Sequence, residues 1–182
     1  MSVTKLNLVV AVCENMGIGI EGRLPWRLKQ DMAFFKKITL ETVDKDKKNM
    51  VVMGRKTWES IPSKFKPLAN RINVVLSTRL TEAPPGALLA GSLKEALCLA
   101  QDDSSVENVL IIGGASVYQE AVQGDWPCRI YLTRIQQEFV CDTFFPQFDT
   151  EVFKKIQNPD CVPSGEQQEG DVKFTFEVYE KN

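Results

Sequence analysis

Histidine is absent from the 182 residues of the chain. Its absence excludes Ser-His-Asp and Cys-His catalysis, together with every metal site that contains histidine. Proton transfer near neutral pH must then use a carboxylate, lysine, cysteine, tyrosine or water. Carboxylates in apolar surroundings become the leading candidates, because burial raises their pKa toward the neutral range.

The chain also lacks paired-cysteine motifs and a strong excess of either charge. Its five cysteines are an odd number without a C-x-x-C spacing, which indicates free thiols in a reducing compartment. The net charge is -2, so we expect neither a nucleic-acid partner nor a membrane surface. The segment 1–15 has no basic leader region, and its apolar run is too short to span a bilayer. We therefore expect a cytoplasmic protein.

No internal repeat, low-complexity tract or long linker divides the chain, so residues 1–182 are expected to form a single domain. Apolar, β-branched runs predict buried strands at 6–13, 50–53, 72–76, 87–90, 109–112 and 130–135. Helical patterns fall between several of them, at 25–38, 55–61, 93–101 and 115–122. This alternation favours an α/β fold with a largely parallel sheet.

The last segment of the sequence has a different pattern. Phe174, Phe176 and Val178 alternate with polar residues, which is typical of an antiparallel strand with one solvated face. A mixed sheet is therefore expected. Polar or turn-forming segments at 41–49, 83–86 and 163–171 are predicted to be loops.

One carboxylate lies where apolar residues are expected. Pro25 suits the first position of a helix, and Leu28, Met32 and Phe35 recur at helical spacing. Asp31 falls on that same face. It could simply favour the positive end of the helix dipole while its side chain reaches water. Alternatively, it lines a pocket and meets a polar ligand there.

The segment GIGIEG, residues 17–22, fits G-x-G-x-x-G by letter, but it is not a Rossmann fingerprint. That fingerprint needs its glycines directly after a strand and at the opening of a helix. Here three residues intervene after the strand, and Arg-Leu-Pro-Trp follows. We predict a flexible, glycine-hinged loop that can close over a site, and the alternative is an ordinary surface loop.

Three predicted strand ends carry groups that suit anions. MGRKTWESIP places Gly54, Arg55, Lys56 and Thr57 at a strand-to-helix turn, IIGGASVY repeats the arrangement, and LSTR ends a third strand. Each could instead be a simple turn or a solvated helix start. Ligands of open α/β sheets bind at such ends, so together they suggest a dinucleotide beside a flat, polar-edged substrate.

Arg71 opens the third of these strands and is a possible carboxylate partner, or else part of a surface ion pair of little energetic value. The sequence has neither the P-loop lysine motif nor H-E-x-x-H. ATP hydrolysis and zinc chemistry are therefore not indicated, and no metal site is expected.

The segments VVAVCENMGIGIEGRLPW, MGRKTWESIP, PLANRINVVLS, IIGGASVY and CDTFFP resemble the dihydrofolate reductase family of the animal type. Similar segments run from about Leu6 to Tyr179, in the family's order. The resemblance implies an eight-stranded, mainly parallel mixed sheet flanked by about four helices. It also implies NADPH-dependent reduction of 7,8-dihydrofolate to 5,6,7,8-tetrahydrofolate, with hydride transfer to the pterin imine and protonation assisted by water.

The same resemblance implies roles for individual residues. Asp31 matches the family's active-site acid, Thr133 its hydrogen-bond partner, and Trp26 the residue that helps to hold a water, with Leu24 beside them. The implied substrate-binding residues are Val9, Ala11, Asp31, Phe35, Ile61, Phe65, Leu68, Arg71, Ile112 and Tyr118. The implied cofactor-binding residues are Ala11, Ile18, Gly19, Gly22, Leu24, Gly54, Arg55, Lys56, Thr57, Leu76, Ser77, Thr78, Gly114, Ala115, Ser116, Val117 and Tyr118.

The resemblance further implies a monomer that binds antifolates such as methotrexate or trimethoprim-like compounds. The chain departs from vertebrate forms at Thr78 and Gly91, where basic residues usually contact the 2′-phosphate of the cofactor, although Arg79 could compensate. Phe65 also replaces a common polar residue. Two alternatives stay open: a non-catalytic module that binds NADP or folate on the same fold, and a reductase of the same fold that acts on another heterocycle.

Overall fold

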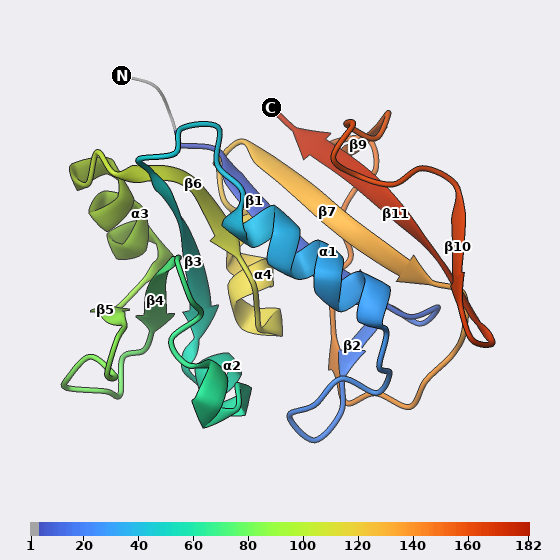
Figure 1. Ribbon diagram of the computed structural model, residues 1–182, viewed down its shortest axis with the longest axis horizontal. Coiled ribbons are helices and arrows are strands. Elements are labelled where there is room, and N and C mark those ends of the chain that lie inside the picture. The colour runs from blue at the N-terminus through green and yellow to red at the C-terminus, as the bar shows by residue number, and fades with distance from the viewer. Residues whose placement is uncertain (1–3) are drawn as a thin grey trace.

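A mainly parallel β-sheet forms the centre of the computed structural model, which describes residues 4–182 (Figure 1). Eight strands follow one another in the order β10-β11-β7-β1-β6-β3-β4-β5, and the short β9 pairs with β11. The neighbours from β7 to β5 are parallel, whereas β11 is antiparallel to β7, β9 and β10. The predicted mixed sheet with an antiparallel last strand is confirmed.

The strands and helices have the following bounds. The strands are β1 Leu6–Val12, β2 Gly17–Gly19, β3 Lys48–Gly54, β4 Ile72–Leu76, β5 Leu88–Ala90, β6 Val106–Ile111, β7 Cys128–Ile135, β8 Thr143–Phe144, β9 Lys154–Ile156, β10 Glu166–Glu169 and β11 Val172–Lys181. The α-helices within residues 4–182 are α1 Lys29–Leu40, α2 Arg55–Ser60, α3 Leu93–Asp102 and α4 Ala115–Gln123.

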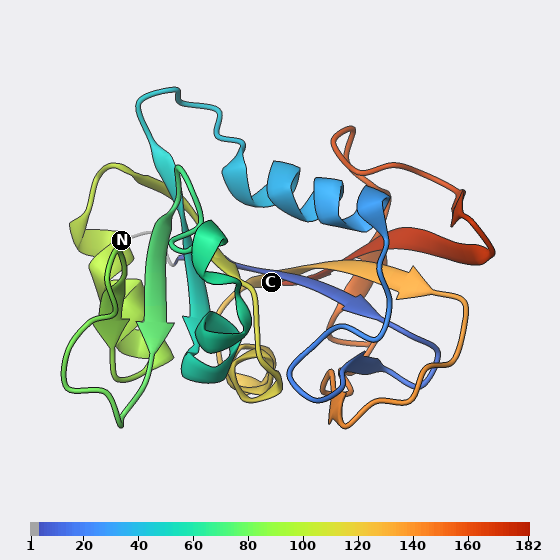
Figure 2. The same cartoon turned by 60° about the horizontal axis from the view of Figure 1, so that its bottom comes forward.

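The helices cover both faces of the sheet. The face with Leu6, Leu8 and Val10 of β1 packs against α3 and α4. On the opposite face, α1 contributes Phe34 and α2 contributes Trp58. Figure 2 shows α1 above the sheet and α4 below it. Because helices cover both sides, the central strands are almost entirely apolar, which is the pattern that the sequence displays.

The helix predicted from residue 25 begins only at Lys29. Leu28 has an extended backbone (φ −121°, ψ 110°), so the prediction that Pro25 opens the helix is wrong. The reason is tertiary packing. Trp26 and Leu28 are buried, and the ring of Trp26 lies 5.5 Å from that of Phe139. Burial of these two side chains keeps the segment extended before α1.

The N-terminus of α1 receives its cap from a distant strand. The carboxylate of Glu169, in β10, accepts hydrogen bonds from the backbone N–H groups of Lys29 (2.8 Å) and Gln30 (2.9 Å). These bonds satisfy helix donors that have no partner within α1, and they lower the pKa of Glu169. The prediction of a loop over 163–171 is wrong for residues 166–169, which form β10 and hold this cap.

We expect Glu169→Gln to lower the melting temperature, because the helix then loses its anionic cap. The folded pKa of Glu169 lies below the ordinary value of 4.5. Its stabilisation is therefore present above that value and is lost as the pH falls through the folded pKa. Thermal melts of wild type and variant should converge in acid. Glu166→Gln, an exposed change in the same strand, is the matched control and should melt like wild type.

No helix among residues 4–182 is long and apolar enough to cross a membrane. Residues 1–3 belong to the segment in which no leader is expected, and they lie outside the described residues.

Candidate active site

A cleft of about 1410 Å³ opens at the carboxyl ends of β1, β3, β4 and β6. In Figure 1, the arrows of β3 and β6 point toward α2 and α4, which begin at this edge. Parallel open sheets bind their ligands at this place, because strand ends and helix N-termini meet there.

The lining of the cleft brings together most of the residues that the sequence singled out. They come from strands β1, β2, β3, β4 and β7, from helices α1, α2 and α4, and from the segments that flank these elements: Val9, Ala11, Ile18, Gly19, Gly22, Leu24, Asp31, Phe35, Gly54, Arg55, Lys56, Thr57, Ile61, Leu76, Ser77, Thr78, Ile112, Gly114, Ala115, Ser116, Val117, Tyr118 and Thr133. Their convergence from distant parts of the chain creates a single large site.

Asp31 is held in the cleft by a neighbouring strand. It lies in the first turn of α1 and is half-buried, and its Oδ1 accepts a hydrogen bond from Thr133 Oγ1 of β7 at 2.7 Å. Burial raises the pKa of Asp31, and the bond from Thr133 lowers it by a smaller amount. The side chain is therefore a poorly solvated carboxylate inside a ligand-sized cleft, as the second interpretation of its position predicts.

Tyr118 links α4 to β1 at the floor of the cleft. Its hydroxyl donates a hydrogen bond to the carbonyl oxygen of Val9 at 2.7 Å. Burial raises the pKa of Tyr118 above its ordinary range, and the negative charge of Asp31 raises it further. The tyrosine stays neutral at physiological pH, so it fixes the floor of the cleft through a hydrogen bond.

The other end of the cleft is built for anions. Helices α2 and α4 both begin there, and neither start has a side-chain cap. The side chains of Arg55, Lys56 and Thr57 surround the first helix start. Gly113 has φ 128°, and a Cβ on it would lie 3.3 Å from Thr57 Oγ1. Free N–H groups, cations and exposed backbone together suit phosphate groups.

Two features weaken the positive charge at this end. Arg55 Nη1 already forms an ion pair with Glu59 at 2.8 Å, four residues later on α2. At the start of α3, Glu95 Oε2 accepts a hydrogen bond from the N–H of Gly91 at 2.6 Å. Because Gly91 lines the cleft, the carboxylate of Glu95 lies close to the cleft. Arg79, which also lines the cleft, acts in the opposite direction because it adds a positive charge.

The glycine-rich segment is more ordered than predicted. Residues Gly17–Gly19 form β2, which pairs with β8. The prediction of a loop throughout residues 17–22 is therefore wrong at its start. Its tip keeps left-handed residues at Glu21 (φ 49°) and Gly22 (φ 75°), and the N–H of Glu21 donates to Asp142 at 2.9 Å. The segment lines the cleft beside α1.

Four of the predicted site residues are absent from the lining: Trp26, Phe65, Leu68 and Arg71. Trp26 is buried, and its Nε1 has no hydrogen-bond partner within residues 4–182. Phe65 is exposed on a 3₁₀ turn, and Leu68 packs against the core cluster that includes Phe34 and Trp58. Arg71 donates to Thr39 Oγ1 and the carbonyl of Ala69. None of the ion pairs within the described chain involves Arg71, so the surface-ion-pair interpretation is wrong.

Several lining residues were not identified from the sequence. Asp142 and Thr143 lie in CDTFFP, which carried the resemblance but received no role. Four further residues line the cleft: Arg23 on a turn, Ser60 at the end of α2, Ser92 at the N-cap of α3 and Glu120 within α4. No local signal in the sequence marks these residues, because none belongs to a spacing pattern with its own chemistry.

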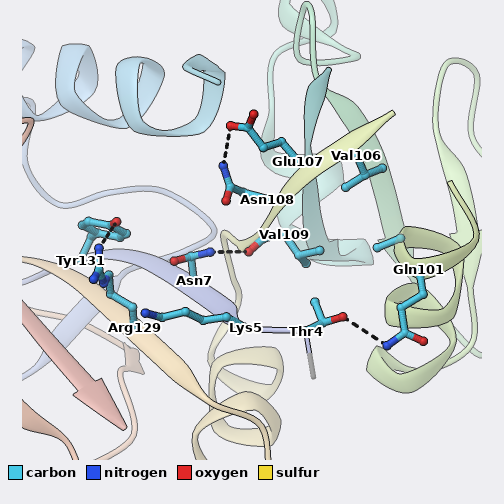
Figure 3. A pocket seen from close by; sticks show the side chains of 11 residues that line it. Thr4, Lys5, Asn7, Gln101, Val106, Glu107, Asn108, Val109, Arg129 and Tyr131 are labelled. Carbon is cyan, nitrogen blue, oxygen red and sulfur yellow. Dashed lines mark hydrogen bonds between the residues drawn. The ribbon is translucent and has the colours of Figure 1, made fainter. Parts of the chain in front are cut away.

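A second hollow of about 470 Å³ lies at the start of β1 (Figure 3). Its cations are paired within the chain: Lys5 Nζ and Arg129 Nη2 both donate to Glu180, at 2.9 and 2.8 Å. Glu107 accepts hydrogen bonds from two backbone N–H groups of the loop before β3. These groups stabilise the start of the sheet, at the opposite end of β1 from the cleft.

Comparison with known proteins agrees with this architecture. A family model described as "Dihydrofolate reductase" matches residues 5–181. The dihydrofolate reductase of Drosophila melanogaster is 44% identical over 180 residues, covering 98% of each chain, and that of Sus scrofa is 48% identical, covering 99% of this chain and all of the other. The solved structure of Schistosoma mansoni dihydrofolate reductase, 46% identical, superposes with a TM-score of 0.87 and full coverage of both chains.

The fold, the cleft and these relatives together define an α/β oxidoreductase. Within that class, the chain belongs to the dihydrofolate reductase family, and its relatives place it among the animal-type members. The resemblance noted in the sequence is thereby confirmed along nearly the whole chain.

Proposed function

We propose that the protein reduces 7,8-dihydrofolate to 5,6,7,8-tetrahydrofolate with NADPH as the cofactor. The observation that carries this proposal is Asp31, a half-buried carboxylate that Thr133 orients inside a cleft with an anion-binding end. Membership of the dihydrofolate reductase family supports the same reaction.

Asp31 would bind the amidine-like edge of the pterin. Two parallel N–H donors suit one carboxylate, and such charge-assisted hydrogen bonds are stronger than neutral ones. Its raised pKa brings Asp31 closer to a protonated state that can assist proton transfer. The buried Nε1 of Trp26 needs an acceptor, and a water there would satisfy it and extend a proton path toward the pterin.

The residues at the anion-binding end fit NADPH. Arg55, Lys56 and Thr57 would hold its phosphates with the free helix starts of α2 and α4, and the glycines at 113 and 114 admit close backbone contact. When bound, NADPH supplies the hydride. The protein's part is to orient the substrate, exclude water and deliver the proton, with the segment from Ile18 to Leu24 covering the reacting end.

The direct test mixes purified protein with NADPH and dihydrofolate at neutral pH and follows the absorbance of the reduced nicotinamide. Loss that requires both compounds supports the proposal. Tight binding of NADPH without its consumption would instead favour the non-catalytic module. Consumption with other pterins in preference to dihydrofolate would favour a reductase of another heterocycle.

Arg55 should determine the preference for NADPH over NADH. We expect Arg55→Ala to weaken NADPH binding about tenfold or more, because a charge-assisted bond to the extra phosphate is lost, and to change NADH binding little. Titrations of both nucleotides measure this. Glu59→Gln is the control: it frees Arg55 from its exposed ion pair and should not weaken NADPH binding. Equal losses for both nucleotides in Arg55→Ala would contradict the assignment.

The remaining proposals concern the substrate tail and the state of the protein. Arg71 would bind the glutamate carboxylate of the substrate, since its guanidinium has no acidic partner within residues 4–182. Antifolates that mimic the pterin would compete for Asp31. We also propose that the protein is a single-domain monomer and that it resides in the cytoplasm. The free state of all five cysteines supports the proposed location. Size-exclusion chromatography tests the monomer.

A further inference from the structure

Two cysteines that are far apart in the sequence meet beneath the glycine-rich segment. Cys13 follows β1 and is buried, whereas Cys141 precedes β8 and is partly exposed. Their sulfur atoms lie 3.8 Å apart, in van der Waals contact. The other cysteines lie elsewhere, with Cys98 exposed on α3 and Cys128 buried at the start of β7.

The surrounding backbone holds the two thiols in place. Asn15 Oδ1 accepts hydrogen bonds from the thiol of Cys13 (2.8 Å) and from the N–H of Gly17 (3.1 Å). Asn15 Nδ2 donates to the carbonyl of Phe139, two residues before Cys141. Gly17 lies directly against Cys141, and a Cβ at this glycine would overlap the sulfur. The contact is therefore part of the packing between β2 and the segment that leads to β8.

We propose that Cys13 and Cys141 form an oxidisable dithiol site, which hydrogen peroxide converts into an intramolecular disulfide. The Cys141 thiol loses its proton, its thiolate attacks one peroxide oxygen, and the O–O bond breaks. A sulfenic acid forms, and the leaving hydroxide takes up the released proton and becomes water. The Cys13 thiol then loses its proton and attacks that sulfur, the S–S bond forms and the S–O bond breaks. The leaving hydroxide takes up the Cys13 proton and becomes the second water. Two thiols are oxidised and one peroxide is reduced to two waters.

Access and proximity set the order of these steps. Cys141 meets the oxidant first because its side chain reaches solvent and that of Cys13 does not. Burial and the neighbouring Cys13 raise the pKa of Cys141, so the first step should accelerate as the pH rises and the thiolate population grows. The second step is intramolecular, and the sulfurs need to approach by only about 1.8 Å to reach bonding distance.

The bond would tie the end of β1 to the start of β8 under β2. Strands β2 and β8 form a two-stranded antiparallel ribbon. This ribbon carries Ile18 and Gly19, which line the cleft together with Asp142 and Thr143. Drawing the two sulfurs together should shift the ribbon and slow turnover, reversibly. This last consequence rests on the proposed function, whereas formation of the bond does not.

The experiment maps disulfides and thiols without relying on activity. Wild-type protein is treated with hydrogen peroxide in mildly alkaline buffer, its free thiols are blocked with N-ethylmaleimide, and an unreduced digest is analysed by mass spectrometry. We expect a peptide that links Cys13 to Cys141, reversed by dithiothreitol. Cys98→Ser is the matched control and should give the same link. Phenylarsine oxide, which bridges paired thiols, should bind wild type and Cys98→Ser, but neither Cys13→Ser nor Cys141→Ser.

The result that overturns the site is Cys141 recovered as a sulfinic acid or a mixed disulfide while Cys13 remains a free thiol. Retention of phenylarsine oxide by Cys141→Ser, a nearly isosteric change at a partly exposed position, would also overturn it. A linked protein with unaltered turnover would overturn only the effect on the ribbon. An inactive wild type with an intact link would count against the proposed function and leave the site standing.

Discussion

Asp31→Asn should lower the turnover number by about 10²–10⁴-fold and, at the same time, raise the melting temperature at neutral pH. Turnover falls because the amide cannot carry the charge or the proton that the pterin edge needs. The variant is more stable because it removes a poorly solvated carboxylate: in the wild type, the folded pKa of Asp31 exceeds the ordinary 3.8. The native state thus binds its proton more tightly than the unfolded chain does, and stability declines as the pH rises above 3.8 through the folded pKa.

Steady-state kinetics and thermal melts across a pH series measure both effects. The gain in melting temperature should shrink in acid and vanish below the unfolded pKa, where Asp31 is protonated in both states. Thr133→Val is the companion variant: it removes the hydrogen bond at 2.7 Å but keeps the carboxylate. Near-normal turnover in Asp31→Asn at neutral pH would eliminate the proposed role, whatever its stability.

Phe174→Ala should reduce the free energy of unfolding by about 3–5 kcal/mol, the range for removing a large aromatic side chain from a packed core. Phe174 is fully buried in β11, and its ring meets that of Phe176 edge to face at 5.7 Å. The strand pairs with β7 on one side and with β9 and β10 on the other, so the surroundings cannot easily collapse into the cavity. Urea titrations at fixed temperature measure the loss.

Lys173→Ala is the control for this variant, in the adjacent position of the same strand. Lys173 points to solvent and forms only an exposed ion pair with Glu166 at 3.8 Å. Its replacement should change the free energy of unfolding by no more than about 0.5 kcal/mol. Similar losses for both variants would show that the alternation of buried and exposed residues along β11 does not control its stability.

The central strands could be predicted from the sequence because burial on both faces leaves a continuous apolar run. The run at 72–76 matches β4 at both ends. Strands such as Gly17–Gly19, Thr143–Phe144 and Lys154–Ile156 could not be predicted, because they are two or three residues long and exist through their pairing partners. The predicted start of α1 is wrong for a related reason. Trp26 packs against Phe139, which lies far along the chain, and no local pattern encodes that contact.

The residues of the candidate site also fall into two groups, those with a local signal in the sequence and those without one. Asp31 could be identified as a carboxylate among apolar residues, and Arg55 to Thr57 by their place after a strand. The bond from Thr133 had no local signal and was expected only through the family resemblance. The cap from Glu169 and the contact between Cys13 and Cys141 join segments separated by 139 and 128 residues, which no local pattern encodes. The pairing of Arg55 with Glu59 fits the i,i+4 spacing on one helix, so this contact has a local signal in the sequence.

The position of β1 between β6 and β7 governs how the chain reaches its native state. Leu6 aligns with Val109 on one side and with Cys128 on the other, so both neighbours of this first strand lie in the second half of the chain. Closing such large loops costs conformational entropy before the hydrogen bonds and packing between the strands can stabilise the chain. Folding is therefore slow. Until then, an apolar strand with two unpaired edges is free to associate with other chains. Refolding yield should therefore fall as protein concentration rises, even though β1 is fully enclosed in the finished sheet.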